Sequence, residues 1–186
     1  MIIDRASGWI EGVRRVDSPN CDDRPQADDL GLIVVHGISL PPGEFGGEWI
    51  HRLFRNDLPP DAHPYFATIQ GLEVSAHVLV DRAGALTQFV PFQRRAWHAG
   101  KSVHRGRSAC NDFSIGIELE GADDVPYADA QYAPLAALIR ALRRAYPMLR
   151  PADVVAHSDI APGRKTDPGP GFDWPRLRAL LQLSRG

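Results

Sequence analysis

The apolar residues of this 186-residue chain are gathered into short β-branched runs that end abruptly. Leu30–Val35 and Val154–Ala156 have the length and the composition of buried strands. The first run stops at His36 and the second at His157. Because strand ends lie at the rim of a sheet, where ligands and substrates reach them, both histidines are candidate site residues.

Three further segments are predicted to be strands. Residues 74–80 alternate well enough between the two faces of a strand, and a turn at 81–84 leads into 85–90. These two strands therefore form a hairpin. Residues 113–119 form a separate strand.

Apolar residues at helical spacing predict the helices. Trp49 and Leu53 mark the buried face of a short helix, and the longest helix covers about 129–146. Asp173 is placed to cap a last helix, whereas residues 1–29 read as an N-terminal arm or loop. Strands and helices mix without strict βαβ alternation, which predicts an α/β fold with a mixed central β-sheet flanked by helices.

Length and composition are those of one ordinary domain, which we take as residues 1–186. The chain is 44% apolar and 24% charged, and no Gly/Ser tract or charge run divides it. A formal net charge of −2 gives no support to a nucleic-acid or anionic-membrane partner, since both need an excess of basic residues. We expect a soluble monomer.

The N-terminal sequence and the cysteines favour the cytoplasm. Met1–Arg5 has no basic segment leading into an apolar one, and no apolar run approaches the ~20 residues that span a bilayer. Cys21 and Cys110 are far apart and have no metal-like spacing. We expect both to be reduced, unpaired thiols in a reducing compartment.

A third possible metal ligand, Asp167, follows the two histidines in a proline-stiffened loop, Pro162–Pro170. Two imidazoles and one carboxylate are a typical ligand set for catalytic zinc, which keeps its fourth position for water. Spacing alone leaves other combinations open, because seven histidines offer many triples.

Five motifs, in order, resemble the type 2 N-acetylmuramoyl-L-alanine amidases, and within that family the cytosolic members that act on 1,6-anhydro-N-acetylmuramyl-L-alanine. The resemblance runs from about Gly8 to Leu180, and its most specific motif joins a histidine, a lysine and an aspartate at fixed spacing. The five segments are Val34–Pro42, Val74–His77, Arg95–Gly100, Asn111–Gly121 and His157–Pro170.

This resemblance implies zinc bound by His36, His157 and Asp167, with Glu118 and Lys165 acting on the substrate. It also implies the mixed-sheet fold of bacteriophage amidase-type lysozymes and animal peptidoglycan recognition proteins. The implied reaction is zinc-dependent hydrolysis of the amide between the muramic acid lactyl group and L-alanine, on small anhydro-muropeptides from peptidoglycan recycling.

The implied roles make physical sense. Zinc polarises the scissile carbonyl and lowers the pKa of its bound water to about 7. Glu118 then accepts a proton from that water and later passes one to the departing amine. Lys165 supplies positive charge where the oxyanion develops, an effect often worth ~3 kcal/mol.

Two departures from the family pattern stand out. Gly37 follows the first histidine, where close relatives usually carry asparagine, and we expect the loss of that amide to remove a substrate hydrogen bond. After His157, this chain has Ser158 and Asp159, where the family most often has Cys-Asn or Cys-Asp. We expect this difference to leave zinc binding unaffected.

Three more residues are candidate substrate contacts. Trp97 and Tyr65 could stack on sugar or line a peptide groove, although large aromatic residues often belong to the core. Arg107 could pair with a carboxylate of the stem peptide, or lie in a solvated loop.

Other polar residues near these motifs read as supporting groups. Glu120 shares a strand face with Glu118, and we expect it to be a hydrogen-bonding partner or a rim carboxylate. We expect His77 and His98 to support the site from outside or to pack in the core.

Two other functions remain open from the sequence. One is a non-catalytic binding module that keeps the fold, which the presence of all five implied site residues disfavours. The other is a lytic amidase acting on intact peptidoglycan, which would require export or phage-type release.

Overall fold

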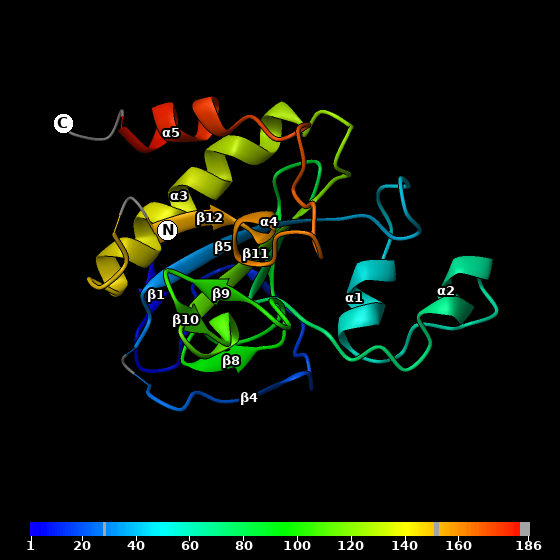
Figure 1. The fold of residues 1–186 in the computed structure, drawn as a ribbon, viewed down its shortest axis with the longest axis horizontal. Helices are drawn as coiled ribbons and strands as arrows, with labels where there is room; N and C mark the ends of the chain where they lie inside the picture. Colours follow the sequence, from blue (N-terminus) through cyan, green and yellow to red (C-terminus); the bar gives the residue numbers. More distant parts are fainter. Residues whose placement is uncertain (28, 151–152, 183–186) are drawn as a thin grey trace.

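The computed structural model describes residues 1–27, 29–150 and 153–182, and a six-stranded sheet runs through their centre (Figure 1). The strand order across the sheet is β12-β5-β11-β6-β7-β3. The bounds of these strands are β3 Arg14–Arg15, β5 Leu32–Ile38, β6 Val78–Val80, β7 Leu86–Gln88, β11 Ser114–Glu120 and β12 Val154–Ala156.

The sheet is mixed, as predicted. Strands β12, β5, β11 and β6 run parallel, whereas β7 is antiparallel to β6 and parallel to β3. The pairing of β5 with β11 extends over seven residues of each strand, from Leu32 with Ser114 to Ile38 with Glu120. Both strands are buried along nearly their whole length, which explains their β-branched composition.

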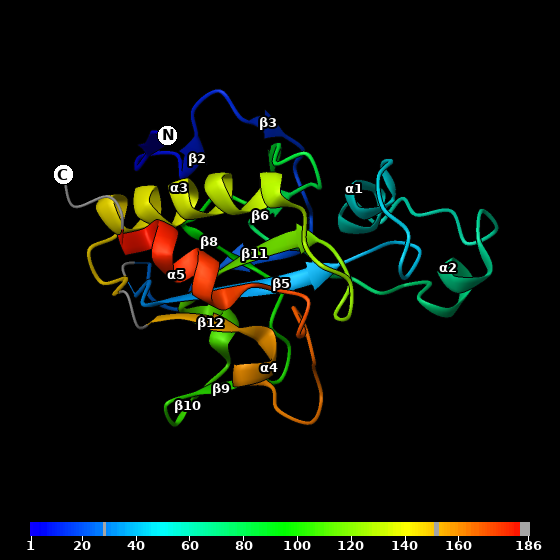
Figure 2. The same ribbon diagram turned by 90° about the horizontal axis from the view of Figure 1, so that it is seen from above.

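One face of the sheet is covered by α3 (Asp129–Ala145), against which α5 (Trp174–Gln182) packs (Figure 2). Apolar residues of α3 join those of β5 and β11 in one core cluster, and they include Leu135, Leu138, Ile139 and Leu142. The Oδ1 atom of Asp173 accepts the N–H of Arg176 at 2.9 Å, so the predicted cap of the last helix is present.

Two short helices, α1 (Trp49–Phe54) and α2 (Pro64–Thr68), lie to one side of the sheet and not on the face that α3 covers (Figures 1 and 2). A second apolar cluster joins them to the sheet, and Leu53, Phe54, Phe66, Leu79 and Phe89 belong to it. The predicted helix after Trp49 is confirmed. Helix α2 was not predicted.

The expectation of an N-terminal arm was wrong. This segment holds β1 (Ile3–Asp4), β2 (Trp9–Ile10), β3 and β4 (Cys21–Asp23), and β3 joins the central sheet. The buried side chain of Gln88 fixes the segment, because it accepts the N–H of Ile10 and donates to the carbonyl of Gly8. Strands of two or three residues are too short to show periodicity.

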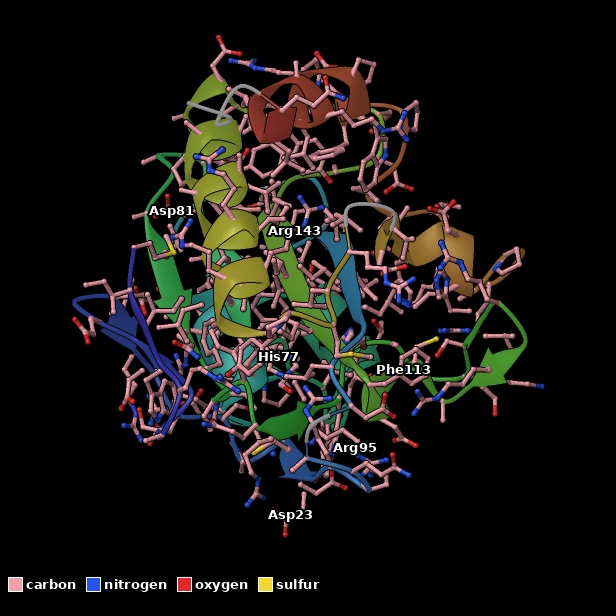
Figure 3. All side chains as sticks on the ribbon, turned by 90° about the vertical axis from the view of Figure 1, so that its left-hand side faces the viewer. Asp23, His77, Asp81, Arg95, Phe113 and Arg143 are labelled. Carbon is pink, nitrogen blue, oxygen red and sulfur yellow. The ribbon has the colours of Figure 1, made fainter. Side chains whose placement is uncertain are left out.

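The remaining elements are two short strand pairs, a 3₁₀ turn and a short helix. Strand β8 (Arg94–Ala96) pairs with β4, and β9 (Val103–His104) pairs with β10 (Arg107–Ser108). A 3₁₀ turn at Cys110–Asp112 and the short helix α4 (His157–Ile160) complete the set. Figure 3 shows His77 in the interior and Asp23 at the margin.

The bounds of three strands differ from the predictions. The first strand continues past His36, because Gly37 and Ile38 still pair with β11. The hairpin strands are regular only over Val78–Val80 and Leu86–Gln88.

Cys21 and Cys110 are free thiols, and no described helix is both long and apolar enough to cross a membrane.

Candidate metal centre and active-site cleft

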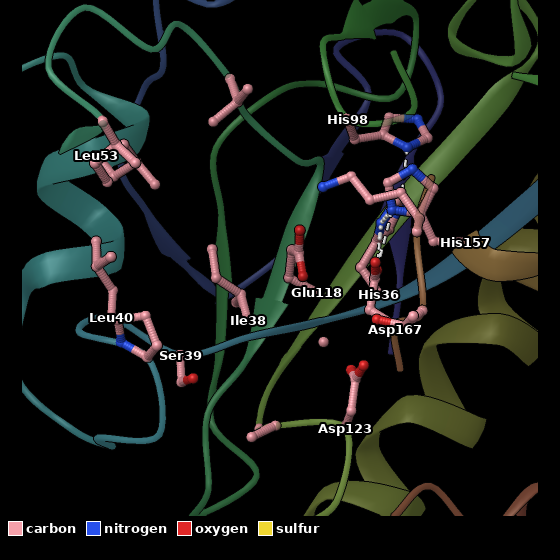
Figure 4. A pocket seen from close by; sticks show the side chains of 18 of the residues that line it. His36, Ile38, Ser39, Leu40, Leu53, His98, Glu118, Asp123, His157 and Asp167 are labelled. Carbon is pink, nitrogen blue, oxygen red and sulfur yellow. Dashed lines mark hydrogen bonds and ion pairs between the residues drawn. The ribbon is translucent and has the colours of Figure 1, made fainter. Parts of the chain in front are cut away.

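Three side chains converge at one end of the parallel strands: His36, His157 and Asp167 (Figure 4). The Nδ1 atoms of the two histidines are 2.9 Å apart. The Oδ2 atom of Asp167 lies 3.0 Å from Nδ1 of His157 and 3.3 Å from Nδ1 of His36. Both imidazoles are buried, with 1% and 3% of their residue surfaces exposed.

The strand order brings these residues together. Strand β12 pairs with β5 so that Ala156 lies opposite Val35, and the next residues are His157 and His36. The chain then turns through α4 and returns, and the backbone N–H of Ser158 donates to the carbonyl of Asp167 at 3.1 Å. This bond holds the carboxylate of Asp167 beside the two imidazoles.

The geometry fits a zinc ion. Ligand atoms about 2.0–2.2 Å from a tetrahedral zinc lie roughly 3.3 Å from one another, and the three separations here are within a few tenths of an ångström of that value. Burial lowers the pKa of His36 to about 4, so its metal-binding neutral form prevails near pH 7.

A cleft of about 720 Å³ opens over this cluster, a size suited to a small-molecule ligand. The walls come from the loop after β5, from α1 and α2, from the segment after β11 and from the loop after α4. Site residues predicted from the sequence that line it are His36, Tyr65, Glu118, His157, Lys165 and Asp167.

Glu118 lies on β11 directly opposite His36 of β5. Its Oε2 atom is buried and has no hydrogen-bond partner among the described residues. Burial raises the pKa of Glu118 well above its ordinary value, the charge of Asp167 raises it further, and the charge of Lys165 opposes both. An unpartnered carboxyl with a raised pKa is suited to accepting and returning a proton.

Glu120 has a different role in the structure. Its Oε1 atom accepts the N–H of Gly46 at 2.5 Å, and its Oε2 atom accepts the N–H of Arg82 at 3.1 Å. These bonds tie the loop that follows β5 to the turn between β6 and β7. Glu120 is therefore a supporting hydrogen-bonding residue.

Two of the three predicted substrate contacts are not among the residues that line the cleft. Asp22 on β4 has a pKa below its ordinary value, because it accepts hydrogen bonds from Arg95, which has the larger effect, and from the Trp97 side chain. The Trp97 side chain is therefore turned toward β4. Arg107 pairs with Asp29, and its guanidinium lies 3.8 Å from the centre of the Phe113 ring.

The two departures from the family pattern have structural counterparts. A Cβ atom on Gly37 would lie 2.0 Å from the hydroxyl oxygen of Tyr127, so a side chain there requires that hydroxyl to move. The hydroxyl of Tyr127 donates to the carbonyl of Pro168, next to Asp167. The carboxylate of Asp159 accepts the N–H of Ala156 at the start of α4.

Sequence reasoning missed the support that Tyr127 gives to the Asp167 loop. Tyr127 lies in the irregular segment between β11 and α3, where no periodicity marks a buried aromatic residue. His98 was expected to support the site or to pack, and its Nδ1 atom lies 2.9 Å from Nε2 of His36.

A mixed sheet that carries two histidines and a carboxylate at the floor of a cleft is typical of metal-dependent α/β hydrolases. The profile of the N-acetylmuramoyl-L-alanine amidase family, Amidase_2, matches residues 26–170, which include all three donors. The chain belongs to this family of type 2 amidases.

Individual relatives agree with this assignment. The chain is 58% identical to 1,6-anhydro-N-acetylmuramyl-L-alanine amidase AmpD of Salmonella typhimurium over 177 residues, 95% of this chain and 94% of that protein. A crystal structure of a selenomethionine AmpD derivative matches with a TM-score of 0.93 and 56% identity, over 97% of this chain and 99% of that one. The predicted fold class is confirmed.

A more distant match is the Escherichia coli amidase AmiD, solved in complex with anhydro-N-acetylmuramic acid-L-Ala-D-γ-Glu-L-Lys as substrate. Its TM-score is 0.60 at 31% identity, and the alignment covers 86% of this chain and 60% of that one.

Proposed function

We propose that this protein is a zinc-dependent amidase that cleaves the bond between the lactyl group of 1,6-anhydro-N-acetylmuramic acid and L-alanine. Its substrates are small muropeptides released during peptidoglycan recycling. The name of the AmpD relative, 1,6-anhydro-N-acetylmuramyl-L-alanine amidase, and the ligand in the AmiD complex support this choice of substrate. The proposal includes one domain acting as a monomer in the cytoplasm, with no nucleic-acid or membrane partner.

The observation that carries the proposal is the position of Glu118 relative to the donor cluster. His36, His157 and Asp167 present three donor atoms to one point, and Glu118 lines the same cleft with its Oε2 atom unpartnered among the described residues. Binding modules need no such proton acceptor. An unpaired, buried carboxyl beside three converged donors is therefore better explained by hydrolysis.

A zinc ion bound by these donors would supply a Lewis acid that polarises the scissile carbonyl. It would also lower the pKa of a water, so that the water loses a proton more easily as it attacks the carbonyl. Glu118 accepts the proton of the attacking water and returns a proton to the amine of L-alanine as the amide bond breaks. Lys165 also lines the cleft, and its positive charge favours the negative charge that develops on the carbonyl oxygen.

The remaining walls of the cleft select the substrate. Tyr65 on α2 is 37% exposed and lines the cleft, so its ring can stack against the sugar or the peptide. Of the three substrate contacts expected from the sequence, only Tyr65 enters this proposal.

A hydrolysis assay tests the function. Purified protein is incubated with anhydro-N-acetylmuramyl peptide, with the same peptide on a reducing sugar, and with intact sacculi, and released peptide is measured by chromatography. We expect the highest kcat/KM on the anhydro sugar. Faster release from sacculi would indicate a lytic amidase, and binding without release would indicate a recognition module.

A further inference from the structure

The turn formed by Trp97–Gly100, which we call the 97–100 turn, contacts both histidines of the donor cluster. The Nδ1 atom of His98 lies 2.9 Å from Nε2 of His36. The backbone carbonyl of Ala99, the next residue, lies 3.3 Å from Nε2 of His157. Each donor histidine therefore turns one nitrogen to the donor cluster and the other to this turn.

These contacts select a tautomer for each donor histidine. A carbonyl oxygen can only accept a hydrogen bond, so Nε2 of His157 carries the proton and Nδ1 keeps its lone pair. His98 lies between two groups, since its Nε2 atom is 3.1 Å from the hydroxyl of Ser114. When Nε2 of His98 donates to the Ser114 hydroxyl, Nδ1 of His98 is unprotonated and accepts a hydrogen bond from Nε2 of His36. Nδ1 of His36 then keeps its lone pair for a metal, as Nδ1 of His157 does.

Other residues hold the 97–100 turn in place. The Oδ1 atom of Asn111 accepts the backbone N–H groups of His98 at 3.2 Å and of Ala99 at 2.8 Å. The guanidinium of Arg164 donates to the carbonyl of Ala99 at 2.6 Å. Gly116 of β11 leaves room for the His98 ring, because a Cβ atom there would lie 2.4 Å from its Cγ atom.

We propose that His98 is a positioning residue for the metal centre: it holds His36 in the tautomer that presents Nδ1 to the metal, while the neighbouring Ala99 carbonyl does the same for His157. This rests on the proposed zinc-dependent function. Outer partners of this kind fix ring orientation, and their loss typically weakens metal binding by about 10–100-fold.

Three variants test the role of His98. His98→Leu removes the acceptor for His36, whereas His98→Asn keeps an acceptor oxygen near the place of Nδ1. His77→Leu is the matched control, because His77 is also a buried histidine but bonds to Arg24, Gly116 and Arg94 rather than to a donor residue. Zinc Kd is measured by chelator competition, and ¹⁵N NMR identifies the metal-bound imidazole nitrogens.

In the wild type we expect Nδ1 to be metal-bound and Nε2 protonated in both donor histidines. His98→Leu should weaken zinc binding by about 10–100-fold, and His98→Asn should recover most of the affinity. His77→Leu should lower Tm without changing the zinc Kd. An unchanged Kd in His98→Leu, equal weakening in His98→Leu and His77→Leu, or Nε2 ligation overturns the proposal.

The zinc Kd values, read together with the hydrolysis assay described above, separate this inference from the proposed function. A wild-type protein that hydrolyses muropeptide without binding zinc, or that binds zinc without hydrolysing, contradicts the proposed function. A wild-type protein that binds zinc and hydrolyses, with a His98→Leu variant of unchanged zinc affinity, contradicts only the role of His98.

Discussion

Glu118 and Glu120 lie two residues apart on β11, yet only Glu120 has hydrogen-bond partners for both carboxylate oxygens. Side chains two apart on a strand point to the same face, so the difference comes from what packs against each one. The loop after β5 and the β6–β7 turn bring N–H groups to Glu120. Glu118 instead faces the open cleft beside His36.

The first prediction separates these two carboxylates. Glu118→Gln should bind zinc as the wild type does but lose activity by about 10²–10⁴-fold, because general acid–base catalysis contributes that much. Glu120→Gln keeps one acceptor for the loop, and we expect a much smaller loss of kcat. Steady-state kinetics with metal analysis tests both, and an inactive Glu120→Gln beside an active Glu118→Gln would reverse the assignment.

A second prediction concerns the metal. One zinc per chain should be found by elemental analysis, chelation should abolish hydrolysis, and added zinc should restore it. His36→Ala should remove zinc because it deletes one of three donors. His104→Ala, on β9 and outside the donor cluster, is the control and should keep zinc. Full activity in metal-free protein would contradict the zinc mechanism.

Stability of the metal-free protein should depend on the ionisation of Glu118. Burial raises the pKa of Glu118 in the folded state, so the unfolded chain releases this proton at lower pH. Between the unfolded pKa, about 4.3, and the raised folded pKa, the unfolded state binds fewer protons, and stability falls as pH rises.

Glu118→Gln removes this titration. The difference in unfolding free energy between variant and wild type should therefore grow in favour of the variant as pH rises above about 4.3. The variant gains ~1.4 kcal/mol of unfolding free energy over the wild type for each pH unit above the unfolded pKa, until the pH reaches the folded pKa of Glu118. Urea unfolding of both proteins from pH 4 to 8 measures it, and parallel curves would show that Glu118 titrates normally.

The fourth prediction concerns substrate binding. Tyr65→Ala should raise KM for the anhydro-muropeptide more than it lowers kcat, because the ring lines the cleft, and a contact made equally in ground and transition states affects binding rather than the chemical step. Trp97→Ala should mainly lower Tm, since that side chain is turned toward Asp22. A larger KM effect from Trp97 than from Tyr65 would mean that Trp97 reaches the substrate.

The long, periodic elements could be predicted from the sequence. Helix α3 and strand β11 agree with the predicted segments to within one residue at each end, because their apolar residues repeat over many positions. The end of β5 could not be predicted: Gly37 has no strand preference of its own, and its pairing with Leu119 of β11 decides its conformation.

The donor residues were indicated by the family resemblance, since spacing alone left other histidine combinations open, whereas their surroundings depend on distant segments. Nothing in the local sequence indicates that Asp29 pairs with Arg107 or that Asp22 draws the side chain of Trp97 away from the cleft. Both partners lie near the N-terminus, in a segment whose short strands leave no sequence pattern. Tertiary pairing therefore decides which polar and aromatic residues line the cleft.

The separation of His36 and His157 along the chain, 121 residues, affects how the protein matures. A nascent chain that has emerged only as far as β11 already exposes His36, but His157 has not yet emerged. Contacts between distant segments form later than local ones because a long loop must close first. Zinc uptake would therefore mark the docking of β12 as a final step of biogenesis, and the binding energy would secure that edge of the sheet.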